Sequence, residues 1–212
     1  MDREHIKAFI NEIQDEPLRR VYLVALFTGM RLGEITGLTW ENVNFISGTI
    51  KVSRQLQRFN GCYKMVPPKN GKTRTIVPAP FVLELLREEK KSQEQQREKV
   101  GKLWSNDLNL VFTNAIGGNH THRILLLHLK KHARAIGMPD LRFHDLRHTY
   151  AVTAITEGVD YKTVSENLGH SSVAFTMDTY VHLTGDMQRA GAEKMQKYID
   201  SLDPQKAVQN DL

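Results

Sequence analysis

The stretch His144-Asp145-Leu146-Arg147-His148-Thr149-Tyr150 has the spacing of an amphipathic helix. On a helix, His144 and Arg147 share one face with their Cβ atoms about 5–6 Å apart, while Leu146 and Ala151 can point inward. A guanidinium matches two phosphate oxygens, and an imidazole beside it can bond the same phosphate or transfer a proton. The pair therefore indicates an anion site, and a solvated His and Arg on a helix surface is the plainer alternative.

Helical periodicity continues on both sides of this stretch, and the centre of the chain changes to short β-favouring segments. We expect helices near 6–13, 18–28, 123–135, 144–157, 161–168, 173–180 and 187–202. We expect strands at 43–45, 49–52, 63–66, 75–77 and 110–113, and a tight hairpin turn at Asn70-Gly71. The pattern predicts an α+β fold, a mostly helical single domain with a small antiparallel β-sheet.

Composition restricts the class of protein without identifying it. The 212 residues are 40% hydrophobic and 25% charged, with a formal net charge of +5, enough for one sizeable core. This basic balance permits nucleic acid as a partner. The single cysteine, Cys62, excludes an internal disulfide and a cysteine-based zinc ribbon. No signal peptide or membrane-spanning run is visible, so a soluble protein of the cytoplasm, with no membrane partner, is expected.

Two glycine-bounded corners carry further candidates. In Thr28-Gly29-Met30-Arg31, the glycine ends one helix and Arg31 opens the next beside free backbone N–H groups. In Leu168-Gly169-His170, a second glycine ends a helix and His170 follows it. Tyr180 comes ten residues after His170 on another amphipathic segment. Taken singly, the structural alternatives are a surface arginine, an ordered corner histidine and a packing tyrosine.

The histidines also permit an alternative of another class. His144 and His148 are four residues apart with Asp145 second, which is similar to the zinc-binding pair H-E-x-x-H, and His128 and His132 repeat the spacing. A zinc-dependent hydrolase would need a third ligand and prefers glutamate as its general base. A second alternative is a non-catalytic DNA-binding module, which would bind DNA in a salt-dependent way without forming a covalent product.

The order of these motifs resembles that of the tyrosine recombinase and phage integrase family. The resemblance spans nearly the whole chain and rests on four separated boxes and a lysine segment: Thr28–Gly37, Pro68–Ile76, His144–Tyr150, Leu168–Ser172 and Asp178–Tyr180. It implies the family's catalytic domain, a site-specific recombinase or integrase of mobile elements. The catalytic residues that it implies are Arg31, Lys69, His144, Arg147, His170 and Tyr180.

The family chemistry implies a role for each of these residues. Tyr180 attacks a DNA phosphate to form a covalent 3′-phosphotyrosine and release a 5′-hydroxyl, with no metal or other cofactor. The two arginines clamp the phosphate, His144 assists proton transfer from the tyrosine, and His170 bonds a phosphate oxygen. Lys69 protonates the leaving oxygen; Lys72, after the same turn, is the alternative. Tyr150 competes with Tyr180, but its apolar neighbours favour packing.

The resemblance also implies how the chain is organised and what it binds. Residues 1–182 form the catalytic domain, and residues 183–212 form a C-terminal helix and tail that can be exchanged between protomers. The partner is double-stranded DNA, bound by a homo-tetramer on paired sites, although an isolated domain can be monomeric. Family members usually carry a DNA-binding domain before this one, so Met1 can begin a trimmed chain.

Overall fold

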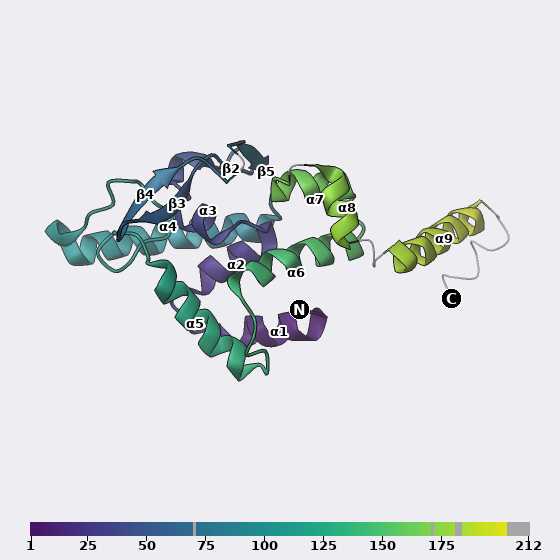
Figure 1. Cartoon of the computed structure of the whole chain (residues 1–212), viewed down its shortest axis with the longest axis horizontal. Helices are drawn as coiled ribbons and strands as arrows, with labels where there is room; N and C mark the ends of the chain where they lie inside the picture. Colours follow the sequence, from purple (N-terminus) through teal and green to yellow (C-terminus); the bar gives the residue numbers. More distant parts are fainter. Residues whose placement is uncertain (70, 171, 181–183, 203–212) are drawn as a thin grey trace.

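The protein is represented by a computed structural model that describes residues 1–69, 71–170, 172–180 and 184–202. The helices are α1 (Arg3–Glu12), α2 (Arg19–Thr28), α3 (Leu32–Thr36), α4 (Pro80–Val100), α5 (His122–Ala135), α6 (Phe143–Thr156), α7 (Tyr161–Leu168), α8 (Val173–Tyr180) and α9 (Thr184–Ser201), with 3-10 turns η1 (Trp40–Asn42) and η2 (Gly101–Leu103). The strands are β1 (Val43–Asn44), β2 (Thr49–Val52), β3 (Gln55–Phe59), β4 (Cys62–Val66) and β5 (Arg74–Ile76). The α+β expectation is confirmed, with mostly helix and two small antiparallel sheets (Figure 1).

Helix α2 lies at the centre of the main core. Its residues 21–26 are all buried, because α6, α4 and α3 pack around it. Tyr22 contacts Phe9 of α1 and Phe143 of α6 at ring-centroid distances of 6.2 and 6.3 Å. Its hydroxyl donates a hydrogen bond to the carbonyl of Leu125 in α5 at 2.8 Å. Tyr22 thus connects α2 with α1, α5 and α6 in the main core.

The strands form two separate sheets. In the three-stranded sheet the order is β1-β2-β5, and Ile50 of β2 pairs with Val43 on one side and Ile76 on the other. The two-stranded sheet is a hairpin of β3 and β4. Its turn residues Asn60 and Gly61 both have positive φ, 46° and 85°, as a two-residue primed turn requires.

This topology changes the interpretation of the second Asn-Gly pair. Asn70 lies outside the described residues, but the strands that flank it, β4 and β5, pair with β3 and β2 rather than with each other. The segment between them connects two sheets and is not a hairpin, so the prediction of a tight hairpin at Asn70-Gly71 was wrong. Both dipeptides carry the same local signal, and strand pairing decides which one closes a hairpin.

The strands differ from the prediction in two further places. Strand β3 was not predicted, because Gln55, Gln57 and Arg58 interrupt its apolar pattern. Residues 110–113 form isolated bridges, Thr39 with Leu110 and Thr113 with Asn119, instead of a strand.

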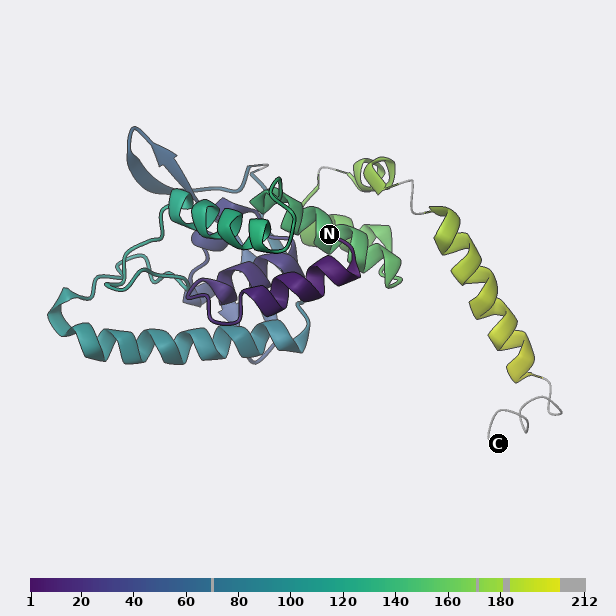
Figure 2. The ribbon, with the colours of Figure 1, turned by 90° about the horizontal axis from the view of Figure 1, so that it is seen from below.

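The C-terminal part forms a second, smaller cluster. Residues of α6, α7 and α8 pack together there: Ala151, Ile155, Val164, Leu168 and Tyr180. Helix α9 lies away from the rest of the chain in both ribbon views (Figures 1 and 2). Within the described residues, no helix is both long and apolar enough to cross a membrane.

Candidate active site

Two helix ends are held together by one buried arginine. Gly29 ends α2 and Gly169 ends α7, both in the left-handed conformation, with φ of 66° and 62°. Arg147, only 4% exposed on α6, donates to the carbonyls of Gly29 and Leu168 at 2.8 and 2.6 Å. The last carbonyls of a helix have no partner inside the helix. Arg147 supplies one at both ends and thereby brings the Arg31 and His170 segments together.

Arg31 is anchored by a carboxylate three residues later. Its backbone N–H donates to Oε2 of Glu34 and its Nη1 donates to Oε1, each at 2.9 Å. Arg74 of β5 donates to the same two oxygens through Nη1 and Nη2, at 2.9 and 2.7 Å. Burial alone would raise the pKa of Glu34, but the hydrogen bonds and charges of Arg74 and Arg31 outweigh it and lower the pKa to about 2.

Sequence reasoning missed both Glu34 and Arg74. The spacing of Arg31 and Glu34 fits a capping box at a helix start, and this signal could have identified Glu34. For Arg74, the local sequence contains no comparable signal, because its partners lie 40 and 93 residues away.

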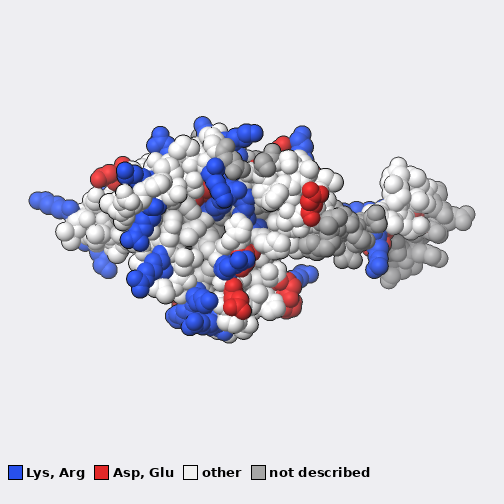
Figure 3. All heavy atoms as spheres, in the orientation of Figure 1, with Lys and Arg blue, Asp and Glu red and all other residues white. Residues whose placement is uncertain are grey.

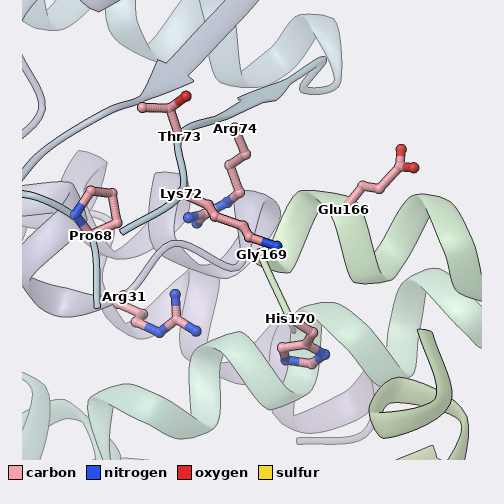
Figure 4. A pocket seen from close by; sticks show the side chains of 8 residues that line it. All are labelled: Arg31, Pro68, Lys72, Thr73, Arg74, Glu166, Gly169 and His170. Atoms are coloured by element: carbon pink, nitrogen blue, oxygen red, sulfur yellow. The ribbon is translucent and has the colours of Figure 1, made fainter. Parts of the chain in front are cut away.

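A pocket of about 330 Å³ opens beside this network (Figure 4). It is lined by Arg31, Pro68, Lys72, Thr73, Arg74, Glu166, Gly169 and His170. Figure 4 shows Arg31, Lys72 and His170 around the same space, each from a different segment. A second pocket, of about 250 Å³, is lined by Arg31 together with His144, Arg147 and the apolar residues Met30, Leu32, Leu126 and Phe143, with Arg142 completing it. Because Arg31 lines both, the two pockets adjoin.

The charges in this region favour the binding of an anion. Burial, followed by the charges of Arg31 and Arg74, lowers the pKa of Arg147 to about 9, so the side chain remains cationic at neutral pH. Burial and the charges of Arg147 and Arg31 likewise lower the pKa of His170 to about 4. The same causes lower the pKa of His144. Both imidazoles are therefore neutral at pH 7. The arginines repel one another, and a bound phosphate would neutralise part of their positive charge.

The surface agrees with this distribution of charge. Figure 3 shows Lys and Arg side chains gathered at the centre of the viewed face and toward its left and lower edges, with few Asp and Glu among them. Such a surface attracts polyanions.

Tyr180 is the last residue of α8 and is only 4% exposed. Its ring centroid lies 5.3 Å from that of His148. Burial raises the pKa of its phenol, and the positive charge of Arg147 acts in the opposite direction. Tyr180 thus lies close enough to Arg147 for the guanidinium charge to affect the pKa of its phenol. It is not among the described residues that line the two pockets.

The two lysines of the segment after β4 differ in position. Lys72 lines the larger pocket, together with Pro68. Lys69 is exposed and is not among the described residues that line it. The structure therefore brings five of the six predicted residues, Arg31, His144, Arg147, His170 and Tyr180, into one region, and it brings Lys72 there rather than Lys69.

Tyr150, the competing tyrosine, is engaged in packing. Its hydroxyl accepts a hydrogen bond from Nδ2 of Asn167 at 2.9 Å, and its ring packs against the second cluster. Burial raises the pKa of its phenol.

The histidine pair of α5 has carboxylate partners. His132 contacts Glu12 through Nδ1 at 3.0 Å and Glu16 through Nε2 at 2.7 Å. His128 contacts Glu16 at 2.9 Å. Among the described residues, no group of three or more His, Cys, Asp or Glu side chains is placed to hold a metal ion.

Comparison with known proteins gives consistent matches. The model of the phage integrase family matches residues 1–186. The chain is 33% identical over 192 residues to a tyrosine recombinase XerC-like protein of Caldanaerobacter subterraneus subsp. tengcongensis, a match that covers 85% of this chain and 49% of the relative. It is 30% identical over 195 residues to the ICEBs1 integrase of Bacillus subtilis, with 91% and 52% covered. The chain thus spans about half the length of these relatives.

A solved structure has the same fold. The integrase of transposon Tn1549, in complex with a circular intermediate DNA, superposes with a TM-score of 0.74 at 22% identity. The match covers 92% of this chain and 65% of that chain.

Proposed function

The chain belongs to the phage integrase family, and we propose that it is the catalytic part of a site-specific DNA recombinase that cleaves and rejoins DNA strands. The observation that carries this proposal is the buried Arg147, which joins the ends of α2 and α7 and so gathers Arg31, His144 and His170 around adjoining pockets. Two arginines and two neutral imidazoles match a phosphodiester in charge and in hydrogen-bond donors.

In the proposed reaction, the Tyr180 oxygen attacks the scissile phosphorus. A bond forms between the phenol oxygen and phosphorus, the bond to the 5′-oxygen breaks, and the 3′-phosphate remains attached to Tyr180. The reverse attack by a 5′-hydroxyl rejoins a strand and releases the tyrosine. The phosphotyrosine retains the energy of the broken phosphodiester, so the scheme uses no high-energy cofactor. It uses no metal, because Arg31 and Arg147 supply the positive charge that neutralises the transition state.

Proton transfer determines the roles of the histidines. A phenol, with an ordinary pKa of about 10, is a weak nucleophile until its proton leaves. A lowered pKa keeps His144 neutral at pH 7, so it can accept that proton. His170 is also neutral and contacts Oγ1 of Thr176 through Nδ1 at 2.7 Å, which leaves Nε2 for a phosphate oxygen.

Departure of the 5′-oxygen requires a general acid. The family pattern favours Lys69 for this role, and we retain it as the proposed acid. We assign Lys72, which lines the pocket, to binding of the phosphate charge. The two roles differ in how they depend on the leaving group, and this difference can be measured.

The partner that we propose is double-stranded DNA, since the Tn1549 integrase was solved in complex with DNA. We further propose that residues 1–182 act as the catalytic domain within a homo-tetramer on paired DNA sites, in the cytoplasm. In this scheme residues 183–212 are exchanged between protomers. The part of them that the structure describes is α9, residues 184–201, and Leu202.

The test is formation of a covalent adduct. The protein is incubated with a nicked duplex substrate in EDTA and quenched with detergent, and DNA-linked protein is resolved by electrophoresis. We expect an adduct whose linkage maps to Tyr180 and that is absent from Tyr180→Phe, whereas Tyr150→Phe retains it. An adduct on Tyr150 would overturn the site assignment, and the absence of any adduct would overturn the proposed activity.

The same experiment separates the alternatives. A zinc-dependent hydrolase would lose its activity in EDTA and would form no adduct. A non-catalytic module would bind DNA with strong salt dependence and leave it intact. The similarity to recombinases does not favour the zinc alternative, and neither does the lack, among the described residues, of a group of His, Cys, Asp or Glu side chains placed to hold a metal ion.

A further inference from the structure

Arg74 joins three segments that carry proposed catalytic residues. It begins β5, directly after the segment that contains Lys69 and Lys72, and its side chain is 9% exposed. Its Nη1 and Nη2 bond both oxygens of Glu34, and its Nε donates to the carbonyl of Asn167 at 2.6 Å. Asn167 lies three residues before His170, and Glu34 lies three residues after Arg31.

The contact with the His170 segment extends beyond one hydrogen bond. A Cβ atom added to Gly169 would lie 3.0 Å from Cδ and 3.1 Å from Nη1 of Arg74. The turn that precedes His170 therefore packs closely on the guanidinium. A displacement of Arg74 would be transmitted to His170 through this contact.

The contact with Arg31 passes through Glu34. The carboxylate is fully buried, so its charge must be compensated by hydrogen-bonded cations. Arg74 binds it in a bidentate manner, whereas the side chain of Arg31 contributes only Nη1. Without Arg74, the buried carboxylate would have Arg31 as its remaining cation and would draw more of that guanidinium away from the pocket.

We infer that Arg74 is a positioning residue for DNA cleavage, which sets the places of Arg31 and His170 through its bonds to Glu34 and to the carbonyl of Asn167. The inference rests on the proposed function and goes beyond it, because it assigns a role to a residue outside the proposed catalytic set. Arg74 compensates Glu34, leaves Arg31 available for the phosphate, and supports the turn before His170. Its loss should therefore affect the chemical step more than DNA affinity.

The experiment measures adduct formation in a single turnover alongside DNA affinity. In Arg74→Met, which keeps much of the side-chain volume, we expect the adduct to form about 100-fold more slowly, because misplaced catalytic groups slow the chemical step by about that much. DNA affinity should change little. The matched control is Arg20→Met, which breaks an Arg–Glu pair with Glu89 between α2 and α4 and should leave the rate of adduct formation unchanged.

A second substitution separates positioning from general damage to the fold. Replacing Glu34 by Gln in the Arg74→Met background removes the charge that draws Arg31 away, so the double variant should form the adduct faster than Arg74→Met. Arg74→Lys, which keeps one charge beside Glu34, should also be faster than Arg74→Met.

Each result then has a definite meaning. Wild-type rates in Arg74→Met, or a double variant and a lysine variant no faster than Arg74→Met, would overturn the inference. If the unmodified protein forms no adduct, the proposed function itself fails, and the inference fails with it.

Discussion

At the scale of single residues, the site combines buried cations with neutral imidazoles. Arg147 is almost completely buried, yet it is stabilised by two carbonyls and keeps a pKa of about 9. His170 has a pKa of about 4 beside it. This arrangement places positive charge where a phosphate can bind, beside a neutral imidazole that can hydrogen-bond a phosphate oxygen.

The roles of the two lysines can be separated by the leaving group. A substrate with sulfur in place of the bridging 5′-oxygen releases a thiolate, which needs no proton donor because a thiol has a pKa of only about 8.5. We expect Lys69→Ala to slow cleavage of ordinary DNA by about 100-fold or more and to be restored on the sulfur substrate. Rates of adduct formation on both substrates provide the measurement.

Lys72→Ala is the matched variant for this comparison. Loss of a phosphate-binding charge should slow both substrates to a similar extent and weaken DNA binding. Restoration of Lys72→Ala by sulfur, with no restoration of Lys69→Ala, would exchange the two roles.

At the scale of the elements, the site depends on how helices end. Helices α2 and α7 both end at a left-handed glycine, and the two ends meet at Arg147. A Cβ atom at Gly29 would lie 2.5 Å from Cδ2 of Leu168 and 2.7 Å from Cδ1 of Tyr150. The conformation and the close approach of neighbours both require glycine here.

We therefore expect Gly29→Ala to destabilise the protein by about 2–4 kcal/mol, from left-handed strain together with overpacking. Urea denaturation followed by circular dichroism measures the change. Gly61→Ala is the control, since Gly61 also has a positive φ, 85°, but a Cβ there would meet nothing within 4 Å. Its cost should be about 1 kcal/mol. Equal losses in the two variants would contradict the role of the close packing.

At the scale of the whole molecule, α9 presents an apolar face without covering the main core. Met195, Tyr198, Ile199 and Leu202 are between 52% and 64% exposed, and the helix lies away from the rest of the chain (Figure 2). Exposed apolar side chains at helical spacing are typical of an interface with another chain. This agrees with the proposed exchange between protomers.

If α9 is exchanged between protomers, a substitution in its apolar face should disrupt assembly on DNA without destabilising the fold. Ile199→Asp should abolish assembly of several protomers on DNA with two sites and leave the melting temperature of the protein nearly unchanged, because the side chain is already 52% exposed. Native electrophoresis of the DNA complexes and thermal denaturation provide the two measurements.

Lys197→Ala, on the exposed polar side of α9, is the control and should assemble normally. Normal assembly of Ile199→Asp would refute the role of this face.

The sequence alone determined the elements that follow from local patterns. Helices such as 161–168 and 173–180 have the expected bounds, because apolar periodicity and glycine at a helix end are properties of neighbouring residues. The expected family membership is confirmed, since its motifs are short and ordered along the chain. The proposed roles of the individual site residues stay predictions.

Only the tertiary structure decided which distant residues meet. It paired β5 with β2, used Asn60-Gly61 as the hairpin turn, and brought Arg74 to Glu34 and Asn167. It also placed Lys72 at the pocket in preference to Lys69. Strand pairing and buried ion pairs depend on the packing of segments far apart along the chain. The residues next to a strand or a charged side chain therefore do not determine which distant segment it pairs with.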